Sequence, residues 1–314
     1  MAYVPSIEDG LKHIVGRETP ESLEAAVLGF HTLLKKDQEK IFGPLGRLRS
    51  FYQSKSLIAW YRDHNLYQCK EFAFLVSMVR RMEHRYRPSA QTYGVASDLL
   101  YPLLSDNEEI IHWHSQFMLP LLITLKNEST RCLDLAKHEY HGMQARLALQ
   151  EEWDLLIRRC EERLRTAPKK DKLHLIDYEF YLGLAEGNIT AMEEALNKLL
   201  SPKVARHRNK EMQWGLEERL LSSWGFIYAK MAWRKGYKLE VDNPWIPQEW
   251  LPIKPLESYP LPHDFLESLD IFEQFTDNEK SWCSRASLFS PRPPSEAMFK
   301  FPEAMELIGK YCKR

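Results

Sequence analysis

The sequence predicts an all-α protein, an irregular helical bundle of antiparallel helical hairpins (solenoid-like units) with an extended proline-rich segment packed on it. Three observations predict this fold. Apolar residues recur at helical spacing along most of the chain, cap residues and glycines separate the periodic stretches, and a run of prolines with two tryptophans follows the last long helix. The 314 residues are 44% hydrophobic, so a sizeable core can form, and we expect almost no strand.

The first half of the chain is predicted to hold two long helices and a shorter one. Thr19-Pro20 is a cap followed by proline at the first helical position, and Gly43-Pro44 is expected to end that helix. A second helix is expected over about 56–86. Ser105-x-x-Glu108 has the pattern of a capping box and predicts the start of a third helix.

The second half begins with the cleanest amphipathic segment, residues 151–165. Its expected core face comprises Trp153, Leu156, Ile157, Cys160 and Leu164. A hairpin follows: a helix over 177–186, a turn at Gly187-Asn188, and a helix capped by Thr190-x-x-Glu193. Gly183 is small enough to let the two helices approach closely. A last long helix is expected over about 216–235.

Residues 243–262 are predicted to be extended and to pack on the helices. The segment contains six prolines, at positions 244, 247, 252, 255, 260 and 262, and a solvated linker would not carry Trp245 and Trp250. Helices are expected again over 263–275 and 302–311, with a loop at 290–294. We therefore expect a helical domain over 1–242, the packed segment over 243–262, and a C-terminal helical extension of the same domain over 263–314.

Composition excludes several classes of protein. The formal net charge of −1 argues against a protein built to hold nucleic acid directly. Five scattered cysteines without a CxxC pair are typical of reduced thiols. No signal peptide or membrane-spanning run is evident, so we expect a cytoplasmic protein that does not bind a membrane.

The motifs of common enzymes are absent from the sequence. It has no G-x-S-x-G elbow, no P-loop and no dinucleotide fingerprint. The stretch His138–His141 is one residue short of H-E-x-x-H, and Glu109-x-x-His112 is a single copy of a motif that di-iron bundles need twice. We therefore expect no catalytic, cofactor-binding or metal-binding residues, and a protein that is not an enzyme.

Charged clusters and tryptophans are the candidates for contact with another protein. The basic clusters are Arg80, Arg81, Arg85 and Arg87, and Lys203, Arg206, His207, Arg208 and Lys210. Both are interpreted first as solvated faces, and the acidic groups near residue 106 as helix-start charges, although both kinds could dock a partner. The predicted partner-binding residues are Asp106, Glu108, Glu109, Arg206, His207, Arg208, Trp245 and Trp250.

The order of several motifs resembles one bacterial family. The motifs are PLLSDN at 102–107, DYEFYLGLAEGN at 177–188, ALNKLLSPK at 195–203, GLEERLLS at 215–222 and AKMAWRKGYKLEVDNPWIPQEWLP at 229–252. In this order they resemble the Imm49 family of polymorphic-toxin immunity proteins, over roughly residues 20–262. The resemblance implies an all-helical cytoplasmic protein that binds and neutralises a cognate toxin domain, usually a nuclease, as a stoichiometric inhibitor. It carries over no catalytic residues.

Two other readings of the sequence stay open. A helical-repeat scaffold or adaptor could bind a peptide partner in a concave face, although one clear hairpin is visible where an array would show several. An enzyme with a buried carboxylate or histidine site in a helical bundle is the third reading. Exposed aromatic residues in the proline-rich stretch could also support a homodimer.

Overall fold

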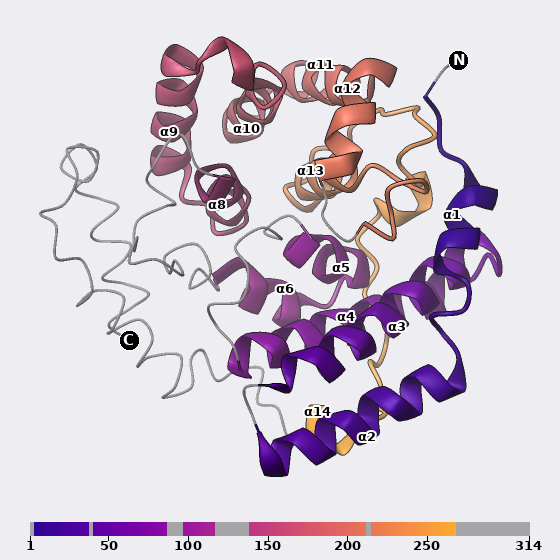
Figure 1. Ribbon diagram of the computed structural model, residues 1–314. Helices are drawn as coiled ribbons and strands as arrows, with labels where there is room; N and C mark the ends of the chain where they lie inside the picture. The colour runs from indigo at the N-terminus through magenta and orange to yellow at the C-terminus, as the bar shows by residue number, and fades with distance from the viewer. Residues whose placement is uncertain (1–2, 38–39, 87–96, 117–137, 212–214, 268–314) are drawn as a thin grey trace, which may run out of the picture.

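The computed structural model describes residues 3–37, 40–86, 97–116, 138–211 and 215–267, and this part of the chain is helical without a strand (Figure 1). The all-α prediction is confirmed. None of the helices within these described ranges is long and apolar enough to cross a membrane. The α-helices are α1 (Ile7–Ile14), α2 (Pro20–Lys36), α3 (Phe42–Tyr61), α4 (Leu66–Tyr86), α5 (Ser97–Ser105), α6 (Glu108–Gln116), α8 (His138–Leu149), α9 (Trp153–Thr166), α10 (Leu175–Glu186), α11 (Ile189–Leu200), α12 (Pro202–Arg208), α13 (Ser223–Arg234) and α14 (Asp264–Glu267). Short 3-10 helices occupy Lys169–Asp171 (η4), Asn209–Glu211 (η5) and Gln248–Trp250 (η6).

Helices that follow one another along the chain pack as pairs. The most extensive contacts join α3 with α4 and α10 with α11, and further pairs are α4 with α5, α9 with α10, and α2 with α3. Buried side chains from almost all of these helices form one continuous hydrophobic core. This arrangement is the predicted bundle of helical hairpins.

The boundaries in the first half differ from the prediction. Helix α2 ends at Lys36, and Gly43-Pro44 lies in the first turn of α3, where a missing backbone donor is harmless. The prediction that Gly43-Pro44 ends the first helix is therefore wrong. The predicted helix over 56–86 is the end of α3 and all of α4, separated by a turn in which His64 has φ 50°.

Asparagine and serine side chains cap helices at positions that the sequence patterns missed. The Asn107 side chain accepts a hydrogen bond from the Ile110 amide at 2.9 Å, and Asn188 accepts from Ala191 at 3.1 Å, so the boxes at Ser105 and Thr190 are not the caps. Ser222 caps α13, which begins at Ser223, seven residues later than predicted. Each of these caps lies directly before the helix that it begins.

The α10–α11 hairpin confirms its predicted turn. Gly187 adopts the left-handed conformation (φ 69°) that ends α10. A Cβ on Gly183 would lie 3.1 Å from the Met192 amide nitrogen and 3.2 Å from the Ala191 Cβ. The two helix backbones therefore approach as closely as the small residue allows.

Helix α9 turns its core face differently from the prediction. Leu156 and Cys160 are buried as expected, but Trp153, Ile157 and Leu164 are only half-buried, because Arg159 and Arg163 point inward. Arg159 stacks 3.9 Å from the Tyr140 ring centroid and donates to the Gln144 side chain, and Arg163 pairs with Asp171. Because such partners satisfy the guanidinium group, an arginine can lie on the core side of a helix, although the sequence pattern places it on the solvent side.

The proline-rich segment packs on the helices. Trp245, Ile246, Trp250 and Leu251 are buried, and the Trp250 ring meets the rings of Trp60 and Phe226 edge-on. The segment runs from the α11–α13 half of the molecule to α14, which lies beside α2 (Figure 1). Of the helix predicted over 263–275, the structure describes α14 alone; the rest, the loop at 290–294 and the helix over 302–311 lie outside the described residues.

Candidate partner-binding surface and the buried ion pairs

The eight predicted partner-binding residues divide evenly into buried and exposed groups. Asp106 and Trp250 are 0% exposed, Arg208 is 1% and Trp245 is 2% exposed. A partner that docks on this folded surface cannot reach these four side chains. Because Trp245 and Trp250 are buried, neither is one of the exposed aromatic residues of the proline-rich stretch that could support a homodimer. The side chains of Glu108, Glu109, Arg206 and His207 are exposed.

Asp106 lies between α5 and α6 and holds two buried lysines. It has φ 57°, a left-handed conformation that aspartate tolerates. Its carboxylate accepts hydrogen bonds from Lys70 Nζ of α4 at 2.6 Å and from the Lys254 amide at 3.1 Å, and it forms an ion pair with Lys230 Nζ of α13 at 2.8 Å. Burial lowers the pKa of Lys230 to about 8, against the attraction of Asp106. Asp106 therefore has a structural role, and the earlier interpretation as a helix-start charge is wrong.

The same lysines fasten the proline-rich segment. Lys70 Nζ donates to the Lys254 carbonyl at 2.7 Å, and Lys230 Nζ donates to the carbonyls of Trp250 and Pro252 at 2.6 and 3.1 Å. Because proline offers no amide hydrogen, this segment cannot form a ladder of its own, and side chains of the bundle satisfy its carbonyls instead.

The two basic clusters are only partly surface features. In the first cluster, Arg80 pairs with Asp98 at 2.7 Å and with Glu83 at 2.6 Å, and the Arg81 guanidinium lies 4.3 Å from the Trp113 ring centroid. The interpretation as a solvated face is therefore wrong for Arg80 and Arg81. The side chains of Arg85 and Arg87 lie outside the described residues.

In the second basic cluster, Arg208 points inward. It pairs with Asp177 at 2.9 Å and donates to the Leu173 carbonyl at 3.0 Å, which anchors α12 to α10. The other four members, Lys203, Arg206, His207 and Lys210, are exposed. The Arg206 guanidinium lies 5.7 Å from the ring of Tyr3, which itself stacks on Trp245 at 4.9 Å. This surface therefore joins α12 with the N-terminal segment.

Acid–base groups are present in the interior, and they contact one another. Burial lowers the pKa of His84 to about 4 and that of His114 to about 3, so both rings are neutral at pH 7. Although burial opposes it, the charge of Arg80 holds the pKa of Asp98 well below its ordinary value. Within the described ranges, no group of three His, Cys, Asp or Glu side chains could hold a metal ion. The structure does not describe the side chains of His138, Glu139 and His141.

The exposed acidic pair lies at the start of α6, next to α13. Both oxygens of the Glu108 carboxylate accept from the Arg234 guanidinium, at 3.0 and 2.5 Å, while Glu109 follows on the outer side. The predicted charges thus lie on two separate surfaces, Glu108 and Glu109 on one and Arg206 and His207 on the other.

Sequence reasoning missed the buried cations that position these surfaces. Lys70, Arg146, Arg159 and Lys230 are at most 2% exposed. A usable signal was present for Lys230, because it stands between Ala229 and Met231 within an otherwise apolar helical run. A lysine in such a run requires a buried carboxylate, and the sequence does not show that Asp106 supplies it.

Fold and site together define the class: a helical protein whose buried ion pairs join helices that lie far apart in the sequence. The family comparison is more specific. Residues 131–250 match the family model of Imm49, Immunity protein 49, which confirms the resemblance over helices α8–α13 and η6. The motif at 102–107 lies outside the matched residues. Neither a curated protein nor a solved structure matches the chain.

Proposed function

We propose that this protein binds a cognate bacterial toxin domain and neutralises it as a stoichiometric inhibitor, without catalysis. The observation that carries the proposal is the Imm49 match over residues 131–250. The buried ion pairs support it, because they hold the helices in fixed positions and so present a preorganised surface.

The toxin domain is proposed to be a nuclease. A nuclease binds phosphates through a basic surface, so an inhibitor that covers that surface gains from carboxylates at the contact. Of the predicted contact residues, Glu108 and Glu109 are the exposed ones with that charge. Arg206 has the opposite charge and lies with His207 on the other surface, so these two positions provide a comparison.

Coexpression tests the function. The toxin domain is taken from the protein encoded by the adjacent reading frame and is produced with or without this chain. We expect growth to be rescued and a 1:1 complex to elute on gel filtration. If cells are not rescued and no complex forms, the proposed function is wrong.

Charge reversal then tests the surface. The variant Glu108→Lys/Glu109→Lys is compared with Arg206→Glu/His207→Glu, and the melting temperature of each is measured by circular dichroism. Reversing a charge at a contact slows association by about tenfold or more at low salt, whereas reversal away from the contact has little effect. If association slows only for the Arg206→Glu/His207→Glu variant, the toxin contact lies on α12 instead. Equal association rates for both variants and the unmodified chain would exclude both surfaces as the toxin contact.

A further inference from the structure

Helix α2 presents an outward face that stays exposed in the part of the chain that the structure describes. Residues Glu21, Ala25, Leu28, Thr32 and Lys35 are all exposed, and their spacing of four, three, four and three places them along one seam of the helix. The opposite side of α2 carries the buried Ala26 and Phe30 and packs on α3. We call these five residues the α2 seam.

Leu28 is the apolar centre of the α2 seam. Its exposed fraction of 65% is larger than that of any other large apolar side chain in the described part of the chain. The remaining large exposed apolar side chains of the described residues, such as Tyr67 and Ile189, lie outside α2. A single exposed leucine is ordinary, so Leu28 matters because of the charges on either side of it.

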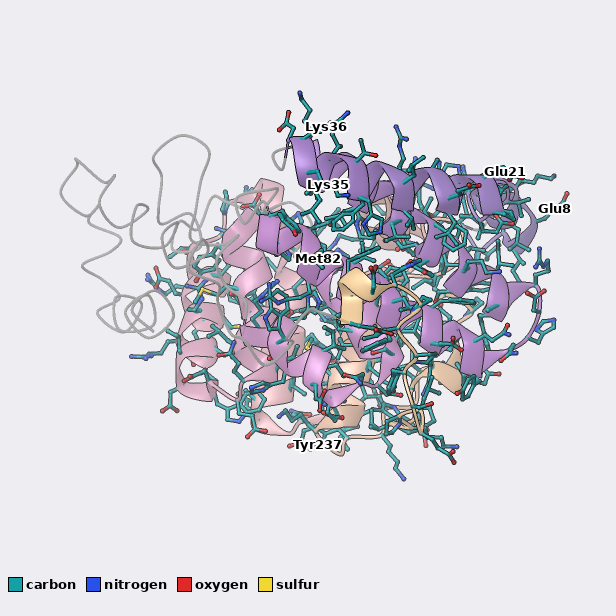
Figure 2. The ribbon with its side chains drawn as sticks, turned by 90° about the horizontal axis from the view of Figure 1, so that it is seen from below. Glu8, Glu21, Lys35, Lys36, Met82 and Tyr237 are labelled. Atoms are coloured by element: carbon teal, nitrogen blue, oxygen red, sulfur yellow. The ribbon has the colours of Figure 1, made fainter. Side chains whose placement is uncertain are left out.

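Those charges are arranged symmetrically around Leu28. Glu21 lies seven residues before it and Lys35 seven residues after it, a distance of about 10 Å along the helix in each direction. Glu24 adds to the acidic end and Lys36 to the basic end. Figure 2 shows Glu21 near one end of α2 and Lys35 and Lys36 near the other.

We infer that the α2 seam is a self-complementary interface that binds a second copy of this chain in antiparallel orientation. With the two-fold axis at Leu28, the two Leu28 side chains meet, and each Glu21 faces the partner copy's lysine at position 35. A parallel pair would place like charges opposite each other, so the charges select the antiparallel arrangement. The small side chains of Ala25 and Thr32 allow the helices to approach.

The dimer is weak and forms reversibly. Helix α2 has 17 residues and is about 25 Å long, and one such helix pair buries less area than stable interfaces usually do. Assembly therefore depends on protein concentration and, because exposed charges contribute, on salt. This contact does not involve the toxin and is independent of the proposed function.

Sedimentation velocity of the full chain at low salt tests the inference. We expect a shift from monomer to dimer with rising concentration, and Leu28→Glu is expected to weaken dimerisation by at least about tenfold, because it places two carboxylates at the axis. As a matched control, Tyr67→Glu changes an exposed apolar residue of α4 and should leave dimerisation unchanged. Circular dichroism checks that each variant is folded.

A charge-swap experiment identifies the pairing. Glu21→Lys alone and Lys35→Glu alone each place like charges together in a homodimer, so each should dimerise about tenfold less readily. A mixture of the two variants restores both attractive pairs in the heterodimer and should recover the dimer. A chain that stays monomeric at all concentrations, a dimer unaffected by Leu28→Glu, or a mixture that does not recover would each overturn the inference.

Discussion

Removing the charge of Asp106 is predicted to destabilise the whole bundle. The carboxylate is 0% exposed and pairs with Lys70 and Lys230, which are 2% and 0% exposed. Asp106→Asn keeps the size of the side chain and tolerates the left-handed backbone, so it isolates the loss of charge. Two lysines then remain buried without a counter-ion.

The magnitude follows from the burial of these groups. Breaking a buried ion pair by removing one partner costs about 3–5 kcal/mol. Since a chain of this length loses roughly 2 °C of melting temperature per kcal/mol, we expect a decrease of about 6–10 °C. Asp63→Asn is the matched control: Asp63 pairs with Arg62 in solvent, so its loss should change stability by less than about 1 kcal/mol.

Urea unfolding followed by tryptophan fluorescence measures both variants. Trp250 is a suitable reporter, because its carbonyl accepts Lys230 and its ring lies in the core. If Asp106→Asn unfolds within about 1 kcal/mol of the unmodified chain, the ion pairs do not hold the proline-rich segment in place and the reasoning above is wrong.

Three further predictions concern pH and packing. His114 has a pKa lowered to about 3, so between pH 6.5 and 3 the unfolded chain binds a proton at this residue and the folded chain does not. The free energy of unfolding should therefore fall as pH drops over this range. In urea titrations at stepwise pH, His114→Gln should lose less of this free energy than the unmodified chain. The pKa of Lys230 is lowered to about 8 from 10.5, so between these pH values the unfolded chain holds a proton that the folded chain has released. The free energy of unfolding of the unmodified chain should therefore rise relative to that of Lys230→Met as pH increases from 8 to 10.5. A difference between the two chains that does not change over this range would contradict the prediction. Gly183→Ala should cost about 1–3 kcal/mol in urea unfolding because its Cβ meets the α11 backbone, whereas Gly43→Ala, with open space around it, should be neutral or stabilising.

The sequence predicted the fold class and the α10–α11 hairpin because those signals are local. Helical spacing of apolar residues and a glycine with positive φ act within a few residues. The boundary at Lys36 was missed because proline has two opposite meanings, ending a helix or beginning one, and Pro44 begins α3. Only the position of the preceding helix distinguishes them.

The buried charges could not be predicted because their partners are distant in sequence. Asp106 and Lys230 are separated by 124 positions, and Tyr101 donates to Glu217 across a similar interval. Trp245 and Trp250 read as a possible docking surface for the same reason, since nothing local shows which helices cover them. A residue pattern gives the chemistry of a side chain, and the tertiary fold decides whether a partner can reach it.

These long-range contacts bear on the region that matches the family. Residues 131–250 contain Lys230, Glu217 and Arg234, whose partners Asp106, Tyr101 and Glu108 all precede residue 131. The 131–250 segment taken alone would expose the lysine and the glutamate without those partners, and it would lose the packing of α5 on α13 and of α6 on α8. Under the proposed function, the surface that binds the toxin therefore depends on contacts between the N-terminal helices and α8–α13 for its shape, and substitutions at the buried Asp106 should weaken toxin binding without touching the toxin.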